Sequence, residues 1–405
     1  MAIDDLSKRY PALKKILIIP PDFTRCYSMA GEITRILYEK FHERAEIHIM
    51  PAVGTHMPLI EEERFKMFGE SIPEACFLHH KWQSDTVPIG VVPREFLAEI
   101  SRGLFAVDVE VELNRRVVEG GYDLVLSVGQ VVPHEVAGMA NYSKNIFVGV
   151  GGRNMINKSH MLGAVCGTEQ ALGNDHTPVR RLFDYAQEKF LKDIPLVYIL
   201  TVTTRDETGV HLNGLFVGSD RTPFEKAVAL SKRLNITYLE KPVRKVVTYL
   251  DEFELKSTWV GNKGLYRTRM IIADGGELVL LAPGVRTFGE NEETDLMIRK
   301  YGYKGRDYVL DLYERGAFGN RAMVAAHLIH GSSDGRFSIT YATDGALLSK
   351  EEVESVGYRH MEIKKAYDLY NPKDLREGFN VLPNGEEIYY VGTPALGLWK
   401  VKETE

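Results

Sequence analysis

A chain of 405 residues with 44% hydrophobic and 26% charged residues has the composition of an ordinary globular protein, and it is long enough for two domains. Its formal net charge of -6 argues against nucleic acid or an anionic membrane as the main partner, because both select basic surfaces. The three cysteines, Cys26, Cys76 and Cys166, form no CxxC motif, so we expect no disulfide framework. The sequence has neither a signal-peptide pattern nor an apolar run of about 18 residues, and we therefore expect a cytoplasmic protein.

Strands and helices are predicted to alternate in the first half of the chain. Short apolar, β-branched runs bounded by turn residues predict buried strands, and longer runs with apolar residues on one face predict helices. We expect strands at residues 14–19, 46–53, 123–128 and 195–203, and helices at residues 29–44, 58–68, 156–172, 179–191 and 223–234. Between these elements we expect an irregular segment at 78–89, a helix at 94–105, strand or helix at 107–118, and turns from 204 to 220.

The chemical character of the sequence changes near residues 235–242, and we place a domain boundary there, giving domains 1–238 and 239–405. In the second domain we expect strands at 245–249, 269–273, 277–282 and 337–341, helices at 294–301, 320–330, 350–356 and 361–370, and a tail of strand and turn from 378. This alternation predicts two α/β domains with mainly parallel sheets and an active site in the cleft between them.

Polar residues of catalytic type follow three of the predicted strands. Asp22 and Arg25 follow the first strand, His56 the second, and His134 the third. Ligands of open parallel sheets bind beyond the carboxyl ends of the strands, so these loops predict one shared site. Each residue alone also fits a structural role, as a loop ion pair or a turn histidine. Their joint placement favours the functional interpretation.

Other motifs give no second candidate. The sequence lacks a complete GxGxxG fingerprint, a GxxxxGK[ST] loop, HExxH and GxSxG. His79 and His80 have no companion ligands at zinc-like spacing, so we predict that they lie at the surface. His327 and His330 share one face of a predicted helix without a neighbouring thiol or carboxylate cluster, and we predict structural roles for them.

The strand-end residues and their order resemble the lactate racemase family, which comprises 2-hydroxy acid racemases and epimerases that depend on a nickel-pincer nucleotide. The matching motifs are DFTR at Asp22–Arg25, GTH at Gly54–His56 and PHxxAG at Pro133–Gly138, followed by Lys144 and His160. The resemblance extends over nearly the whole chain and is strongest from residue 14 to residue 180. It implies that the first domain binds the cofactor and the second closes over the substrate.

The resemblance implies a cofactor and its protein ligands. Lys144 is similar to the lysine that carries the Ni(II) pyridinium-3,5-bisthiocarboxylic acid mononucleotide through a thioamide, and His160 to the imidazole that completes a planar nickel site. Asp22, Thr24 and Arg25 resemble residues that surround the cofactor. We expect maturation enzymes that build the cofactor as partners, and recombinant protein made without them to lack it.

The resemblance also implies a reaction. His56 and His134 are similar to two acid/base residues that move the hydroxyl proton while a hydride leaves and returns to C2. This route avoids a carbanion beside the substrate carboxylate. The planar guanidinium of Arg25 is suited to bind that carboxylate through two parallel hydrogen bonds. A small-molecule substrate, a 2-hydroxy acid, is therefore the expected ligand, and the sequence predicts no particular oligomeric state.

Several positions depart from the family pattern. Asn141-Tyr142 stands where lactate-type members usually have two glycines, Met57 replaces the arginine that commonly follows GTH, and the usual Leu-Tyr-Gln…Lys pattern is absent from residues 295–300. Candidate substrate residues in the second domain are Lys263, Tyr266 and Arg286, which also fit ordinary roles in strands and turns. These departures favour a larger or hydroxylated acid, such as a sugar acid, over lactate.

Two alternatives use the same residues differently. His56, His134 and His160 could form the zinc site of a hydrolase or lyase. A non-catalytic homologue that kept the fold is the second alternative, although the complete set of lysine and histidines argues against it.

Overall fold

The computed structural model describes residues 8 and 10–402, with the exception of residue 207. The chain divides into two compact units: the first consists of the chain up to Cys166 with Gln170–Leu234, and the second of Gly167–Glu169 with the chain from Asn235. The prediction of an active site between the two units stays a prediction.

The division after Leu234 comes before the predicted boundary at residue 238. The segment that follows it, β10 (Ile236–Leu239), pairs in parallel with β17 (Leu398–Val401) near the end of the chain. Because this pairing ties β10 to the second unit, the boundary lies before the strand.

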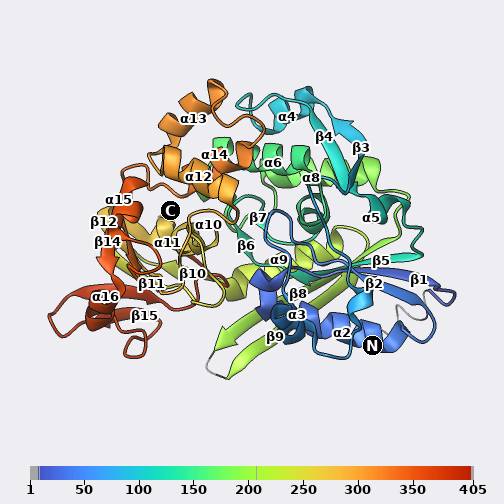
Figure 1. The fold of residues 1–405 in the computed structure, drawn as a ribbon, viewed down its shortest axis with the longest axis horizontal. Coiled ribbons are helices and arrows are strands. Elements are labelled where there is room, and N and C mark those ends of the chain that lie inside the picture. Colours follow the sequence, from blue (N-terminus) through green and yellow to red (C-terminus); the bar gives the residue numbers. More distant parts are fainter. Residues whose placement is uncertain (1–7, 9, 207, 403–405) are drawn as a thin grey trace. The chain divides into compact units, whose positions relative to one another are not determined.

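The first unit is an α/β unit built on a mainly parallel sheet, as the sequence predicted (Figure 1). Its sheet has the order β2-β1-β5-β8-β9, and every neighbouring pair is parallel except β8 with β9. Its elements, with α7 at the division between the units, are β1 (Lys15–Ile19), η1 (Phe23–Ser28), α2 (Ala30–Phe41), β2 (Glu46–Ile49), α3 (Glu61–Phe68), η2 (Glu74–Cys76), β3 (Thr86–Val92), α4 (Arg94–Ile100), β4 (Val109–Asn114), α5 (Arg115–Glu119), β5 (Leu124–Gln130), β6 (Pro133–His134), β7 (Gly138–Met139), η3 (Asn145–Gly149), α6 (Arg153–Cys166), α7 (Thr168–Ala171), α8 (Pro178–Phe190), β8 (Leu196–Asp206), β9 (Gly209–Gly218) and α9 (Thr222–Asn235).

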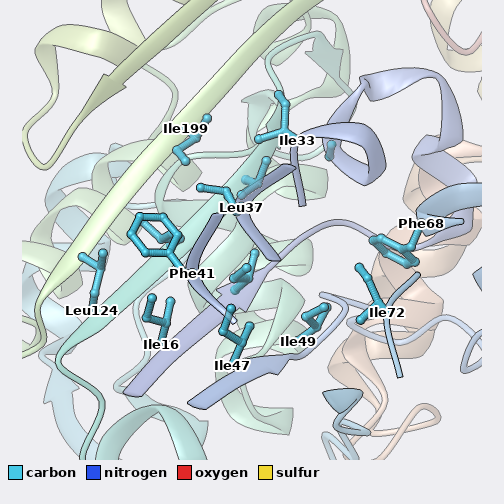
Figure 2. Packing of buried hydrophobic residues seen from close by; sticks show 14 of the residues in the cluster. Ile16, Ile33, Leu37, Phe41, Ile47, Ile49, Phe68, Ile72, Leu124 and Ile199 are labelled. Atoms are coloured by element: carbon cyan, nitrogen blue, oxygen red, sulfur yellow. The ribbon is translucent and has the colours of Figure 1, made fainter. Parts of the chain in front are cut away.

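Helix α2 covers one face of this sheet. Its apolar residues Ile33, Leu37 and Phe41 recur every four positions and therefore lie on one side of the helix. Figure 2 shows them packed against side chains of the sheet such as Ile16 and Leu124. Each fully buried apolar side chain of this kind contributes about 1.5–3 kcal/mol. This core holds β1 and β5 in register and so fixes where their following loops begin.

Three predictions for the first unit are wrong in detail. The segment expected to be irregular at 78–89 includes the first residues of strand β3, which pairs in antiparallel fashion with β4. The expected turns after residue 203 are instead the long β8–β9 hairpin, which Figure 1 shows extending beyond the rest of its sheet. The helix expected at 156–172 is broken at Gly167, whose φ of 93° lies in the left-handed region.

The second unit is also α/β, with the sheet order β14-β13-β12-β11-β16-β15. All neighbouring strands of this sheet are parallel except β15 with β16. Its elements besides β10 and β17 are β11 (Val243–Tyr249), α10 (Thr258–Gly261), α11 (Lys263–Thr268), η4 (Arg269–Ile271), β12 (Ile272–Leu281), α12 (Glu292–Tyr301), α13 (Arg306–Glu314), α14 (Ala322–His330), β13 (Ser338–Thr343), α15 (Lys350–Ser355), β14 (Arg359–Glu362), α16 (Ile363–Leu369), β15 (Gly378–Val381) and β16 (Glu387–Val391).

The second unit corrects three further expectations. The strand expected at 269–273 begins as the 3₁₀ turn η4, and β12 then runs without interruption to Leu281. The helix expected at 361–370 begins only at Ile363, because the residues before it form the edge strand β14. Helix α13 was not predicted. Within the described part of the chain, no helix combines the length and apolar character needed to cross a bilayer.

Candidate active site

The loops that carry the predicted residues leave neighbouring strands of the first unit. β2, β1 and β5 are adjacent and parallel, so their carboxyl ends lie at one edge of the sheet. Beyond that edge, Pro21 forms a parallel bridge to Ala52, and the N–H of Gly54 donates to the carbonyl of Gly149 at 2.9 Å. Backbone contacts therefore tie the loop after β1 to the loop after β2, and the loop after β2 to the η3 segment that follows Lys144.

Asp22 orients His56. The buried Asp22 carboxylate accepts hydrogen bonds at Oδ1 from the backbone N–H and the hydroxyl of Thr24, at 3.1 and 2.7 Å. Its other oxygen, Oδ2, pairs with Nδ1 of His56. Because a carboxylate only accepts, Nδ1 of His56 carries a hydrogen, and Nε2 of the neutral ring keeps its lone pair. His56 is thereby prepared to accept a proton at Nε2.

His134 has the opposite arrangement. It lies on β6, which pairs with β7, and its side chain is buried. Its Nδ1 accepts hydrogen bonds from the backbone N–H groups of Val136 and Ala137, at 3.1 and 3.3 Å. A nitrogen that accepts two N–H groups carries no hydrogen, so the neutral ring holds its hydrogen on Nε2. His134 is thereby prepared to donate from Nε2.

Lys144 lies immediately before the π-helical turn η3 and is partly buried. Burial lowers its pKa to about 8, because an ammonium loses its hydration there. The positive charge of Arg25 lowers the pKa further, while Glu135 and Asp22 oppose the shift. An amine with this pKa is partly uncharged near neutral pH and is therefore a competent nucleophile.

His160 lies on α6, one turn after Ile156. Its Nδ1 is 2.7 Å from the carbonyl oxygen of Ile156, which only accepts, so Nδ1 donates. Burial lowers the pKa of His160 to about 4, and the charges of Lys144 and His56 add to this effect. The ring is therefore neutral at physiological pH and keeps a lone pair on Nε2, which is the form that binds a metal.

These electrostatic effects connect residues from four segments. The loops after β1, β2 and β5 contribute charges that act on Lys144 or on His160 of α6. His134 adjoins the same set through Glu135, whose Oε1 lies 3.8 Å from Nε2 of the histidine. The predicted residues of the first unit thus gather in one neighbourhood.

The predicted substrate residues of the second unit have different environments. Lys263 and Tyr266 are buried on α11, and the Tyr266 hydroxyl hydrogen-bonds Nδ1 of His327 at 3.0 Å. Nε2 of His327 pairs with the Tyr303 hydroxyl at 2.7 Å, which agrees with its predicted structural role. Arg286 is exposed on the loop after β12. A contact between any of these residues and a substrate stays a prediction.

The pair that replaces two glycines adopts a glycine-like backbone. Asn141 and Tyr142 have φ angles of 61° and 54°, in the left-handed region. The Tyr142 ring is buried, stacks on Phe224 at 4.8 Å between ring centroids, and contacts Tyr198 at 4.4 Å. Its hydroxyl accepts a hydrogen bond from Gln187 at 2.6 Å. Because Tyr142 packs into the core, this position gives no support to the inference about substrate size.

Two residues near Lys144 were not predicted. Asn145 donates from Nδ2 to the carbonyl of Ile19 at 3.1 Å and to the Ser127 hydroxyl at 2.9 Å, which fastens η3 to the sheet. Arg180 is fully buried on α8 and donates to the segment before Lys144. The sequence around Asn145 and around Arg180 resembles that of an ordinary helix, so it gives no local signal of these long-range contacts.

His80 corrects another prediction, because it is buried rather than at the surface. Its Nε2 donates to the carbonyl of Gly151 at 3.0 Å, and its Nδ1 accepts from the Asn114 amide at 2.9 Å. Burial lowers its pKa to about 4. His80 therefore supports the backbone between η3 and α6 as a neutral ring.

Comparison with known proteins gives a family. Residues 1–173 match the model of the lactate racemase N-terminal domain. Over 313 residues the chain is 24% identical to a lactate racemase from Thermoanaerobacterium thermosaccharolyticum, which spans 73% of this chain and 68% of that protein. The chain is thus similar to lactate racemases, most clearly over residues 1–173. This similarity supports an isomerase function of the racemase or epimerase type.

Two solved structures share the fold of this chain. A protein from Thermotoga maritima has a TM-score of 0.86 at 23% identity, with 99% of this chain and 97% of that chain covered. The lactate racemase apoprotein from Thermoanaerobacterium thermosaccharolyticum has a TM-score of 0.70 at 19% identity, with 98% and 89% covered.

The donor set of the first unit fits the cofactor that the lactate racemase family implies. That cofactor supplies most of the nickel ligands itself, so one protein imidazole with a free lone pair is required, and Nε2 of His160 meets this requirement. Lys144 supplies an amine that is partly uncharged near neutral pH. Among the described residues, no three or more His, Cys, Asp or Glu side chains are grouped so that they could hold a metal by themselves, as the zinc alternative requires.

Proposed function

We propose that the protein inverts C2 of a 2-hydroxy acid, with Lys144 as the attachment site of a nickel-pincer nucleotide and His160 as its nickel ligand. His56 and His134 act as the acid/base pair. When bound, the cofactor supplies a hydride acceptor that later returns the hydride. The reaction is that of a racemase or epimerase, and a substrate larger than lactate remains part of the proposal.

The observation that carries the proposal is the opposite proton arrangement of the two histidines. His56 holds its hydrogen on Nδ1 against Asp22, whereas His134 holds its hydrogen on Nε2 because backbone N–H groups occupy Nδ1. Inversion through a 2-keto acid needs one group that accepts the hydroxyl proton and returns it as the hydroxyl forms again, and a second group that donates a hydrogen bond to the keto oxygen. The chain has one imidazole in each of these states.

The roles of the chain's residues follow from these states. Nε2 of His56 accepts the hydroxyl proton while C2 becomes a ketone carbon, and the carboxylate of Asp22 stabilises the resulting imidazolium. Nε2 of His134 donates a hydrogen bond to the substrate oxygen at the keto stage. Arg25 binds the substrate carboxylate, whose two oxygens match the guanidinium fork.

A stereochemical screen tests the proposal. The protein is co-expressed with cofactor-maturation enzymes, and 2-hydroxy acids from lactate to sugar acids are incubated with it and separated by chiral chromatography. We expect inversion of at least one acid and a mass increase on the peptide that contains Lys144. Lys144→Ala should abolish both, whereas Lys158→Ala, which removes a lysine that donates to the Asp108 carbonyl, should retain both. Full activity of Lys144→Ala would contradict the proposal.

A further inference from the structure

The segment that leads to Lys144 has an unusual backbone that needs support. Asn141 and Tyr142 are consecutive non-glycine residues in the left-handed region, and each such residue costs about 1–2 kcal/mol. The side chain of Asn141 offsets part of the cost, since its Oδ1 accepts the N–H of Tyr142 at 2.7 Å. The carbonyl groups of the turn still need donors, because the segment is buried.

Arg180 supplies these donors. One terminal nitrogen of its guanidinium lies 2.7 Å from the carbonyl oxygen of Met139, and the other lies 2.8 Å from the Ser143 hydroxyl. Both nitrogens also reach the carbonyl of Asn141, at 3.3 Å each. The guanidinium therefore spans the whole segment from residue 139 to residue 143, which ends next to Lys144.

The surroundings of Arg180 keep its guanidinium directed at this segment. The residue has no exposed surface, and its guanidinium carbon lies 4.6 Å from the centre of the Phe224 ring. Asp184, the nearby carboxylate, pairs with Arg221 and accepts the Ser143 hydroxyl. A point charge such as an ammonium has no planar fork with which to reach all three acceptors.

We infer that Arg180 is the positioning residue for the cofactor-attachment lysine: its guanidinium fixes the left-handed turn before Lys144 and so sets where the amine is presented. This inference rests on the proposed function of Lys144. Arg180 acts through the backbone and needs no contact with substrate. The positive charge of Arg180 also adds to the lowering of the Lys144 pKa, after burial and the charge of Arg25.

Three variants test the role. Arg180→Met removes both charge and fork, and Arg180→Lys keeps the charge without the fork. Arg181→Met is the matched control, because this neighbouring arginine of α8 is exposed and pairs with Glu99 at 2.7 Å. The first measurement is amide hydrogen exchange of residues 139–146 in protein without cofactor, and the second is the fraction of Lys144 that gains the cofactor mass during co-expression with maturation enzymes.

We expect Arg180→Met to accelerate exchange at residues 139–146 by about tenfold or more, as for loss of a charge-assisted hydrogen bond, with β1, β5 and β8 unchanged. Cofactor attachment to Lys144 should fall severalfold in Arg180→Met. Arg180→Lys should recover part of the slow exchange and part of the attachment, and Arg181→Met should behave like the wild-type protein in both. Unaltered exchange, or unaltered attachment, in Arg180→Met would overturn the inference, as would acceleration spread equally over the first unit.

The two hypotheses fail differently. If the unchanged protein never gains mass on Lys144, the proposed function fails, and hydrogen exchange still decides whether Arg180 holds the turn. If Lys144 is modified equally well in the unchanged protein and in Arg180→Met, the positioning role fails and the proposed function stands. If Arg180→Met does not fold, Ser143→Ala removes one acceptor of the fork and should accelerate exchange at the same residues, and its failure to do so would overturn the inference.

Discussion

At the scale of single residues, hydrogen-bond partners decide which ring nitrogen each histidine offers to a ligand. His56 and His160 both donate from Nδ1, the first to Asp22 and the second to the carbonyl of Ile156, and both keep a lone pair on Nε2. His134 has the reverse arrangement. His56 and His160 therefore offer a lone pair at Nε2, which suits a proton acceptor or a metal ligand, whereas His134 offers a hydrogen-bond donor at Nε2. Burial also lowers the pKa of His160, which keeps its ring neutral and able to bind a metal.

Asp22→Asn tests the orientation of His56. The asparagine oxygen can still accept from Thr24, but its amide nitrogen then faces Nδ1 of His56 and favours the ring form with hydrogen on Nε2. We expect kcat of the cofactor-loaded enzyme to fall about 100-fold, as for loss of one general base. Asp123→Asn is the control, because this carboxylate accepts the N–H groups of Lys14 and Lys15 at the amino end of β1. Equal rates for both variants would contradict the role of Asp22.

The lowered pKa of Lys144 predicts its reactivity. In protein without cofactor, acetylation of Lys144 by a limiting reagent should reach half its maximal rate near pH 8, whereas an unperturbed lysine does so near the ordinary pKa of 10.5. Competitive labelling followed by mass spectrometry measures this. Because the unfolded chain binds more protons between these two pH values, the same shift makes the free energy of unfolding rise with pH across that window. Half-maximal acetylation only above pH 10 would contradict the prediction.

At the scale of elements, short segments of special backbone hold the site in place. The β6–β7 pair sets the position of His134 opposite Gly138, whose φ is 80°. A Cβ added at Gly138 would lie 1.9 Å from the carbonyl oxygen of Asn174 and 2.7 Å from that of Ala171. The glycine is therefore required both by its conformation and by the close approach of neighbouring backbone.

Gly138→Ala should consequently disturb the pair. We expect a loss of about 3 kcal/mol or more in the free energy of unfolding, because backbone atoms have to move to admit the methyl group. Gly121→Ala is the matched control, since φ is 63° there and no atom lies within 4 Å of the added Cβ. The control should cost about 1 kcal/mol. Denaturant unfolding measures both values, and equal losses would show that strain at positive φ alone decides the effect.

Tyr142→Phe separates core packing from substrate recognition. The variant loses the hydrogen bond from Gln187, so we expect a loss of about 1 kcal/mol in the free energy of unfolding. The relative rates with different 2-hydroxy acids should stay unchanged, because the ring lies against Phe224 and Tyr198 in the core. A change in substrate preference would instead restore Tyr142 as a substrate-size determinant.

At the scale of the whole molecule, the sequence predicted those features that arise from local patterns. Apolar runs followed by polar residues located β1, β2 and β5 and the loops that carry Asp22, His56 and His134. The resemblance supplied the proposed role of each residue. Contacts between distant segments had no such signal: β3 pairs with β4 across an intervening helix, His80 reaches Gly151, and Arg180 reaches the segment before Lys144. Such contacts depend on how the elements pack, which a periodic pattern does not specify.

Strand β17 stabilises the second unit by joining segments that are far apart in the sequence, and its removal therefore tests the stability of that unit. β17 pairs with β10, the first strand of that unit, and also contacts η4 and α11. Leu398 and Trp399 of β17 are both buried. A chain that ends before Leu398 should therefore lose about 3 kcal/mol or more in the stability of the second unit, from the exposure of two large apolar side chains.

Amide hydrogen exchange in the truncated chain localises this loss. β10 and β11 should exchange faster, whereas β1 and β5 should exchange at their original rates, because the two units have separate hydrophobic cores. A chain that ends after Lys402 keeps β17 and should behave as the full chain does. Faster exchange in β1 and β5 as well would show that the units unfold together, and the stability of the segment around Lys144 would then depend on β17.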